Sequence, residues 1–163
     1  MSASGLLCYC RAGFEPELAA ELTERSALAL QGGHARADRG TGYVVFASND
    51  SVALSRALPW RELIFARQKI ELIAELRMLD PRDRVTPIRE ALAGTSGFGT
   101  LLVEHPDSDE GKPLAGLARS FGNALRPALR KAGILSSRDD ERAPRLHICF
   151  IAGDHAFVGR SHP

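Results

Sequence analysis

The pattern of apolar and polar residues predicts alternating strands and helices in the first half of the chain. A short apolar run over residues 6–10 is typical of a strand, and residues 15–30 place Leu18 and Leu22 on one face of a helix. The other predicted elements are strands over 34–38 and 43–47, a helix over 51–58 and a long strand over 63–76. Either Asn49 or Asp50 can cap the second helix. The order βαββαβ predicts a ferredoxin-like arrangement, a four-stranded antiparallel sheet with two helices on one face.

A domain boundary is expected near Leu79, where a second series of elements begins. Asp80-Pro81 and Thr86-Pro87 each place a capping side chain before a proline, which is typical of a helix start. The remaining predicted elements are a strand over 99–104, a helix over 112–132, a polar loop over 138–144, and strands over 146–152 and 156–160. This half has the order ααβαββ. The predicted fold class is α+β, with domains at residues 1–79 and 80–163.

The long helix of the second half contains one residue that disfavours a helix interior. Leucines and a phenylalanine recur along one stripe of residues 112–132, but Pro127 lies within it. Proline lacks the N–H that a helix interior needs, and its ring collides with the preceding turn. We therefore expect two helices or a sharp kink near residues 123–126.

Positive charge is concentrated at one end of the chain. The net charge is only +1, yet residues 1–110 hold 12 basic and 16 acidic groups, whereas residues 111–163 hold 9 basic and 4 acidic groups. Arg119, Asn123, Arg126 and Arg130 follow one another at spacings of 4, 3 and 4, which aligns them opposite the leucines. Such a row suits a nucleic-acid phosphate backbone. A solvated helix face is the other interpretation.

Cysteine and histidine residues do not form a convincing metal site or disulfide framework. Cys8 and Cys10 alternate on one strand and cannot bridge each other. His147, Cys149 and His155 could meet across a hairpin, but the almost entirely apolar strand around them favours a buried structural role. We expect no metal ion.

No motif in the sequence indicates catalysis. The glycine-rich residues 94–99 follow a predicted helix and precede a strand, which is the reverse of a phosphate-binding turn. A Rossmann-type cofactor loop, a nucleophile elbow and paired catalytic carboxylates are all missing from the sequence. No apolar run reaches the ~20 residues of a membrane span, and the N-terminus does not read as a secretory signal, so we expect a cytoplasmic protein.

Several segments together resemble one family. They include Arg11-Ala12-Gly13-Phe14-Glu15, the run LIFARQ over residues 63–68, DRVTPI over 83–88, residues 125–135 and the strand that ends in Phe150-Ile151-Ala152. The chain resembles the N-terminal portion of the bacterial RlmM family, which methylates the 2′-hydroxyl of one cytidine in 23S ribosomal RNA. The resemblance implies a ferredoxin-like domain followed by a THUMP domain, an RNA-binding module.

The resemblance also implies a part that this sequence does not contain. The family continues into a Rossmann-like domain that binds S-adenosylmethionine and carries a Lys-Asp-Lys-Glu tetrad, whereas the last lysine here is Lys131. We therefore assign no catalytic residue and no cofactor to this chain, and expect an excised or truncated N-terminal region.

The first hypothesis is an RNA-docking module whose partners are 23S ribosomal RNA and the methyltransferase domain of the same protein. The residues expected to contact RNA all lie in the basic half: Arg119, Arg126, Arg130, Lys131, Arg138, Arg142 and Arg145. Two alternatives remain open at this point. A ferredoxin-like module can bind a small regulatory molecule, and it can also serve only as a packing scaffold.

Overall fold

The computed structural model describes residues 2–163, which form one seven-stranded sheet with helices on its outside. The elements are β1 (Gly5–Tyr9), α1 (Glu15–Leu28), β2 (His34–Ala37), β3 (Tyr43–Ala47), α2 (Ser51–Ala57), the short 3₁₀ helix η1 (Trp60–Glu62), β4 (Gln68–Leu76), α3 (Val85–Ala91), β5 (Thr100–Glu104), the 3₁₀ helix η2 (Lys112–Leu114), α4 (Ala115–Lys131), β6 (Arg145–Ala152) and β7 (His155–Ser161). The strand order is β2-β3-β1-β4-β7-β6-β5. Among the strands named here for residues 2–163, β5 and β6 pair in parallel and the other pairs are antiparallel.

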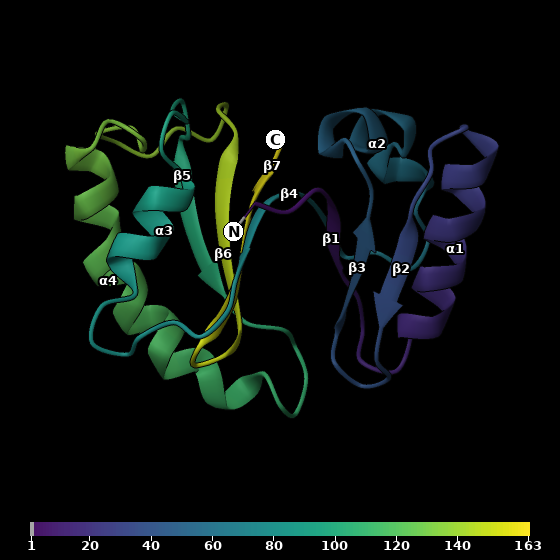
Figure 1. Ribbon diagram of the computed structural model, residues 1–163, viewed down its shortest axis with the longest axis horizontal. Coiled ribbons are helices and arrows are strands. Elements are labelled where there is room, and N and C mark those ends of the chain that lie inside the picture. Colours follow the sequence, from purple (N-terminus) through teal and green to yellow (C-terminus); the bar gives the residue numbers. More distant parts are fainter. Residues whose placement is uncertain (1) are drawn as a thin grey trace.

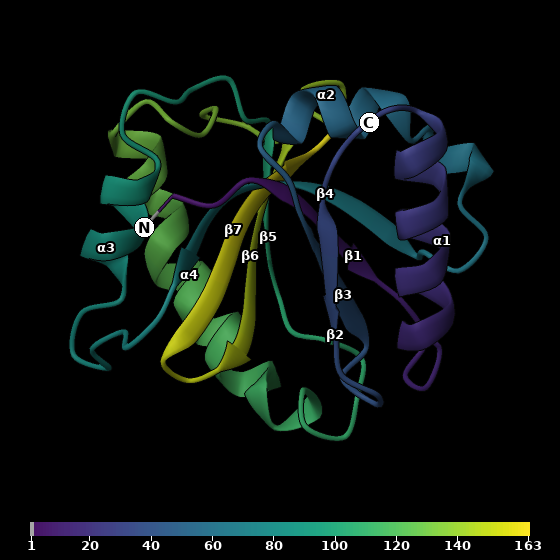
Figure 2. The same cartoon turned by 45° about the vertical axis from the view of Figure 1, so that its right-hand side comes forward.

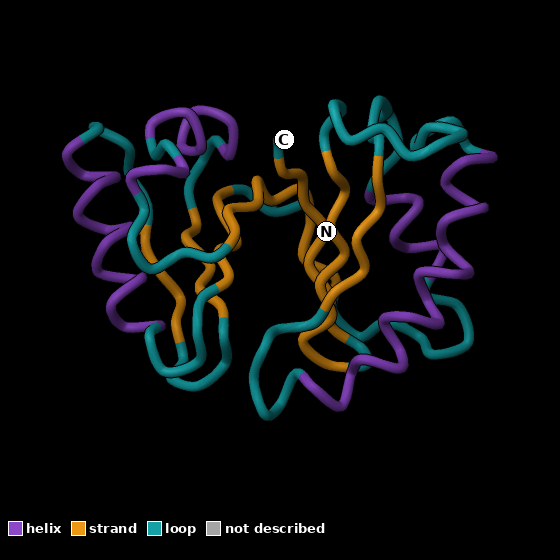
Figure 3. Tube along the Cα trace, turned by 180° about the vertical axis from the view of Figure 1, so that it is seen from behind, coloured by secondary structure: helices purple, strands orange, loops and turns teal. Residues whose placement is uncertain are grey.

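The helices form two separate outer layers. Figure 1 shows α1 and α2 beside the strands of the first half and α3 and α4 beside those of the second half. The turned view in Figure 2 and the view from behind in Figure 3 show the same arrangement, with the strands between the two helical layers. The two halves of the sheet therefore turn their helix-free faces toward each other.

The first half has the predicted ferredoxin-like strand order. Its four strands lie in the order β2-β3-β1-β4, and Leu6, Leu18 and Leu54 from β1, α1 and α2 share one buried cluster. The Asp50 carboxylate accepts hydrogen bonds from the N–H groups of Val52 and Ala53, so of the two candidate caps Asp50 is the one used.

Strand β4 belongs to both halves of the molecule. Its first residues pair with β1, and residues 71–76 pair with β7. The pairing with β7 shifts register between Leu72 and Ala74. Ile70 and Leu72 contact the core between the half-sheets, whereas Ala74 and Leu76 contact the core under α3 and α4. Side chains alternate along a regular strand, so residues 70, 72, 74 and 76 would all face the same core. The register shift between Leu72 and Ala74 lets the first two face one core and the last two face the other.

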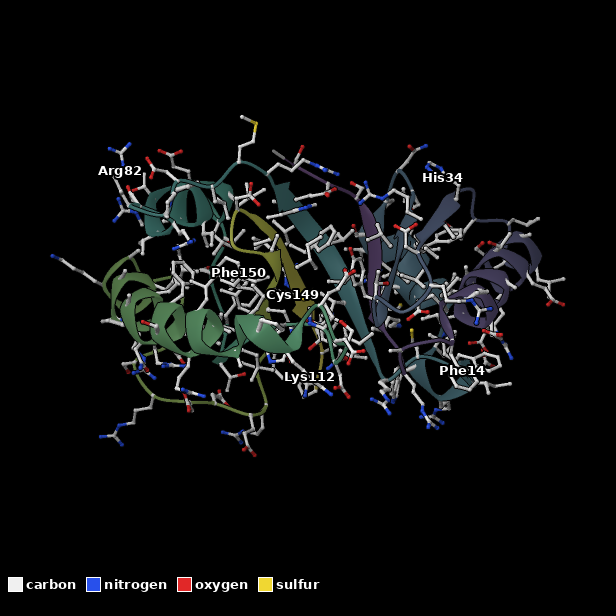
Figure 4. All side chains as sticks on the ribbon, turned by 90° about the horizontal axis from the view of Figure 1, so that it is seen from below. Phe14, His34, Arg82, Lys112, Cys149 and Phe150 are labelled. Atoms are coloured by element: carbon white, nitrogen blue, oxygen red, sulfur yellow. The ribbon has the colours of Figure 1, made fainter. Side chains whose placement is uncertain are left out.

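A third core joins the helix-free faces of the two half-sheets. Leu7 and Val45 of the first half meet Cys149 and Phe157 of the second, and the Tyr43 and Phe157 rings lie 5.9 Å apart. On β6, Phe150 packs on the α4 side and its neighbour Cys149 on the side of this central core (Figure 4). The halves are thus held together by apolar contact as well as by strand pairing.

Gly159 permits the close approach of β7 to β4. A Cβ at this position would lie 2.3 Å from Cγ2 of Ile70 and 2.7 Å from the carbonyl oxygen of Glu71. Neither atom can move away easily, since one is buried and the other is backbone. The seam between the halves therefore requires a residue without a side chain here.

The strand predicted from residue 63 begins later than expected. Residues 60–62 form η1, and β4 starts at Gln68. The Glu21 carboxylate accepts hydrogen bonds from the N–H groups of Ile64 and Phe65, so these groups are not available to a neighbouring strand. The apolar, β-branched composition predicted a strand that is too long, because the distant Glu21 side chain takes the backbone N–H groups that strand pairing would use.

The helix predicted to start at Asp80 is wrong, and the second half has the order αβαββ from α3 onward. Asp83 N–H bonds to Asp80 O, and the Asp80 carboxylate accepts from the backbone and side chain of Arg82, which makes a turn. The following helix starts at Val85, where the Asp83 carboxylate accepts from Thr86 N–H.

The predicted division of the long helix at Pro127 is also wrong, because α4 continues through this residue as one helix. Pro127 is exposed, whereas Phe121, Leu125 and Leu129 are buried against the sheet on the other side. Apolar contacts on both sides of the proline keep both segments in one helix, so tertiary packing outweighs the local cost.

Candidate RNA-binding surface

Basic side chains on α4 lie on the helix surface opposite its buried stripe. Arg119 is exposed and Arg126 is half-buried, and neither forms an ion pair within the described residues 2–163. Lys131 at the end of α4 and Arg138 in the following loop are exposed as well, and in the part of the chain that the structure covers they also have no acidic partner. These four cations are available to an external anion.

Two of the predicted residues are engaged by acids of the loop after α4. Arg130 donates from Nε to the carbonyl oxygen of Ser136 at 3.1 Å and lies 3.2 Å from the Asp139 carboxylate. Arg142 lies 3.7 Å from Asp140, with 95% of its side chain exposed. Exposed pairs of this kind contribute about 0–1 kcal/mol, so a phosphate can replace the acid at Arg142. Arg130 in addition holds the loop against the helix.

Arg145 lies apart from the helix, at the first residue of β6. Its Nε donates to Ser161 Oγ at 3.1 Å and its Nη2 donates to the carbonyl oxygen of His162 at 2.8 Å. The structure therefore divides the seven predicted residues into a helix group, a loop group and one residue at the end of the sheet.

A hollow of about 360 Å³ lies at that end of the sheet, and residues of α2, β4, β7 and the C-terminus line it. Its lining includes Arg145 and three residues that the sequence analysis did not single out: Trp60, Lys69 and Arg160. The hollow is assembled by the pairing of β4 with β7, which joins segments about ninety residues apart. No local motif could have indicated it; the only signal was Arg160 at the end of an apolar strand.

A larger hollow lies elsewhere and has the opposite charge. It measures about 490 Å³ and lies along α1, where Glu17, Glu21 and Glu24 outnumber Arg25. A cluster of carboxylates repels phosphate. Charge, and not size, therefore favours the end of the sheet and the α4 surface as the sites for a nucleic acid.

The buried histidine and cysteine side chains have structural surroundings. His147 lies with Nδ1 2.7 Å from Glu104 and Nε2 2.6 Å from Ser161 Oγ, and Tyr9 donates to Glu104 from across the central core. Burial raises the pKa of the Cys149 thiol to about 12. The thiols of Cys8 and Cys10 have a pKa near 12 for the same reason, with nearby Glu15 raising that of Cys10 further. Such thiols are poor nucleophiles at neutral pH.

Candidate metal ligands are not grouped within residues 2–163. Nε2 of His155 lies 2.7 Å from the Glu75 carboxylate, and both ring nitrogens of His147 contact other side chains. His147, Cys149 and His155 therefore do not form a group that could hold a metal ion within the same residues. In the same residues, each helix is too short or too polar to cross a membrane.

Comparison with known families covers both halves of the chain. The model for the RlmM ferredoxin-like domain matches residues 3–70, and that for the N-terminal region of ribosomal RNA large subunit methyltransferase M matches residues 83–162. The chain belongs to this family. Among curated RlmM sequences, ribosomal RNA large subunit methyltransferase M of Xanthomonas oryzae pv. oryzae is 64% identical over 155 residues, and that of Xanthomonas campestris pv. campestris is equally similar.

The similarity to RlmM is confined to the N-terminal part of the relatives. The match covers 95% of this chain but 45% of the relative's length, so the chain spans about half of the curated RlmM sequences that it matches. The resemblance seen in the sequence is thereby confirmed.

Solved structures share the fold at low sequence identity. TrmN from Thermus thermophilus has a TM-score of 0.58 at 22% identity, over 97% of this chain and 46% of that one. A 4-thiouridine synthetase, solved in complex with RNA and ATP, has a TM-score of 0.51 at 12% identity, over 98% of this chain and 41% of its own. These likenesses concern the fold, and with the family models they confirm the α+β class with ferredoxin-like and THUMP-like halves.

Proposed function

We propose that this chain is the RNA-docking part of a ribosomal RNA methyltransferase. It binds structured 23S ribosomal RNA and presents one cytidine to a catalytic domain of the same protein, which lies outside this sequence and transfers a methyl group from S-adenosylmethionine to a ribose 2′-hydroxyl. The observation that carries the proposal is the 64% identity to RlmM over 95% of the chain. The choice of 23S RNA and of the ribose follows from the family resemblance, and the substrate implies a cytoplasmic location.

The charges on α4 and its loop support recognition of an RNA backbone. Arg119, Arg126, Lys131 and Arg138 have no acidic partner among residues 2–163, and Arg142 has one at the surface. A-form RNA hides base edges in a deep groove, so side chains on a helix reach phosphates and 2′-hydroxyl groups more easily than bases. We propose that these residues, with Arg130 as the support of the loop and Arg145 at the sheet end, form the contact.

Binding should therefore depend strongly on salt and on the exposed α4 arginines. Each phosphate contact releases counterions, and the slope of log affinity against log salt changes by about 0.7–0.9 per contact. We expect the double variant Arg119→Gln and Arg126→Gln to bind 23S RNA fragments more weakly and to lower the slope by about 1–2. Arg130 is left intact, because its bond to Ser136 would confound the result.

Filter binding of unmodified 23S fragments over a salt series measures both quantities. The matched control is Arg11→Gln with Arg39→Gln, which removes two exposed charges near α1 and should leave the slope unchanged. Salt-independent binding, or unchanged binding by the α4 double variant, would contradict the proposed surface. Failure to bind any RNA would refute RNA docking. Thermal stabilisation by a small molecule would then favour the regulatory module, and its absence would favour the scaffold.

A further inference from the structure

The hollow at the end of the sheet combines an accessible aromatic ring with an excess of positive charge. Trp60, the only tryptophan of the chain, is 47% exposed there. The lining holds three cations, Lys69, Arg145 and Arg160, against two carboxylates, those of Glu71 and of the chain end at Pro163. A volume of about 360 Å³ falls within the range of clefts that hold small ligands, about 300–1,000 Å³.

Arg160 is the cation most available to a ligand. Its guanidinium lies over the ring of Phe98, with 5.1 Å from Cζ to the ring centre, and Phe98 is buried. The face of an aromatic ring attracts a cation, so this contact restrains the guanidinium. Within residues 2–163 no carboxylate lies within 4 Å of it. The group is therefore held in place without a partner for its donors.

The other charged groups of the hollow are fixed by contacts of their own. Lys69 Nζ donates to the carbonyl oxygens of Ser55 and Leu58 at 2.8 Å each, at the end of α2. Glu71 is almost fully buried, and its carboxylate lies 2.9 Å from Nε2 of His162, another residue of the lining. The electrostatic potential in the hollow is therefore positive, and its cations are already ordered before any ligand arrives.

We propose that this hollow binds a single unpaired nucleotide of the RNA, with the base on Trp60 and its phosphate on Arg160. A planar aromatic ring accepts any base by stacking, and a guanidinium fork binds two phosphate oxygens. A duplex cannot offer a base to Trp60, so the hollow selects a bulge, loop or end. This inference rests on the proposed function and adds a second, strand-selective contact to the backbone contacts of α4.

The emission of Trp60 reports directly on this site. We expect hexacytidylate to quench the fluorescence of the chain, a blunt RNA duplex of the same length not to quench it, and inorganic phosphate to compete with hexacytidylate. Pro163 ends this chain at the rim of the hollow, so the protein is tested as its C-terminal amide, which keeps a carboxylate from competing with phosphate.

Two variants and one control test this site. Arg160→Gln should weaken quenching by hexacytidylate about tenfold or more, and Trp60→Leu should weaken binding of a labelled hexacytidylate about fivefold or more, as expected for the loss of one stacked base. Arg39→Gln, which changes an exposed cation in the β2–β3 turn, is the charge control and should leave both values unchanged.

The outcomes distinguish the two proposals. Binding of 23S fragments without quenching, and with full affinity in Arg160→Gln and Trp60→Leu, would overturn the nucleotide site and leave RNA docking intact. Equal quenching by the duplex would also overturn it, because strand selectivity is its central claim. Quenching by hexacytidylate in a chain that binds no 23S fragment would support the nucleotide site and refute the docking function.

Discussion

Single residues of this chain hold loops in place through buried polar contacts. Glu15, fully buried at the start of α1, accepts hydrogen bonds from the N–H groups of Gly13, Gly40 and Gly42. Gly40 and Gly42 have φ values of 90° and 83°, which only glycine adopts readily. One carboxylate thus fixes the β2–β3 turn against the helix. Burial by itself raises the pKa of Glu15, but the backbone hydrogen bonds outweigh it and the pKa is lowered.

Replacing Glu15 with Gln should destabilise the chain by about 1–3 kcal/mol, because the amide NH₂ cannot accept the bonds that one carboxylate oxygen accepts now. Since the folded pKa lies below the ordinary value of 4.5, the contribution is complete above that pH and is lost as pH falls through the folded pKa. The difference in unfolding free energy between wild type and variant, measured in urea, should shrink as the pH falls below 4.5. Exposed Glu24→Gln is the control; a difference that does not depend on pH would refute this role.

Elements follow local preference where no distant group competes. Asp50, one of the two predicted caps, caps α2, and the strand over residues 43–47 has the predicted bounds. Where a distant group competes, the element differs from the local preference. Glu21 accepts hydrogen bonds from the N–H groups of residues 64 and 65, and the strand predicted there does not form. In α4 the sheet contacts of Leu125 and Leu129 keep the helix continuous across Pro127, although the carbonyl of Asn123 lacks its usual N–H donor.

Replacing Pro127 with Ala should therefore stabilise the chain by about 1–3 kcal/mol, because it restores this bond and removes the ring collision. Proline also restricts the unfolded chain, which reduces the gain. The matched control is Gly116→Ala. Gly116 is exposed in the first turn of α4 and has open space where a Cβ would lie, so this variant should gain up to about 1 kcal/mol of stability. Thermal unfolding measures the stability of both variants. A smaller gain in stability for Pro127→Ala than for Gly116→Ala would show that Pro127 does not destabilise α4 as proposed.

At the scale of the whole molecule, the two halves share one strand. We propose the boundary near Leu79 as the point where the chain passes from one helical layer to the other. Ala74, Leu76 and Leu79 precede it, yet all three are buried in the core of the second half. The THUMP-like half thus obtains part of its core from the strand that closes the ferredoxin-like sheet.

A fragment of residues 80–163 should therefore be much less stable than one of residues 68–163, which keeps β4. Loss of buried Leu76 and Leu79 costs about 2–5 kcal/mol for each. Near-UV circular dichroism and urea unfolding of the two fragments measure the difference. Equal stability would mean that the second half is complete without β4.

The α4 charges could be predicted from the chain alone, because helical spacing places residues three and four apart on one face. The type and order of most elements, the Asp50 cap and the family likeness also depend on neighbours in sequence. The hollow could not be predicted in this way, since Trp60, Lys69 and Arg160 meet only when β4 pairs with β7. A strand has two edges, and its composition does not say which partner each edge will take. That choice depends on how the apolar faces of both halves pack together, and it placed the basic hollow at the seam.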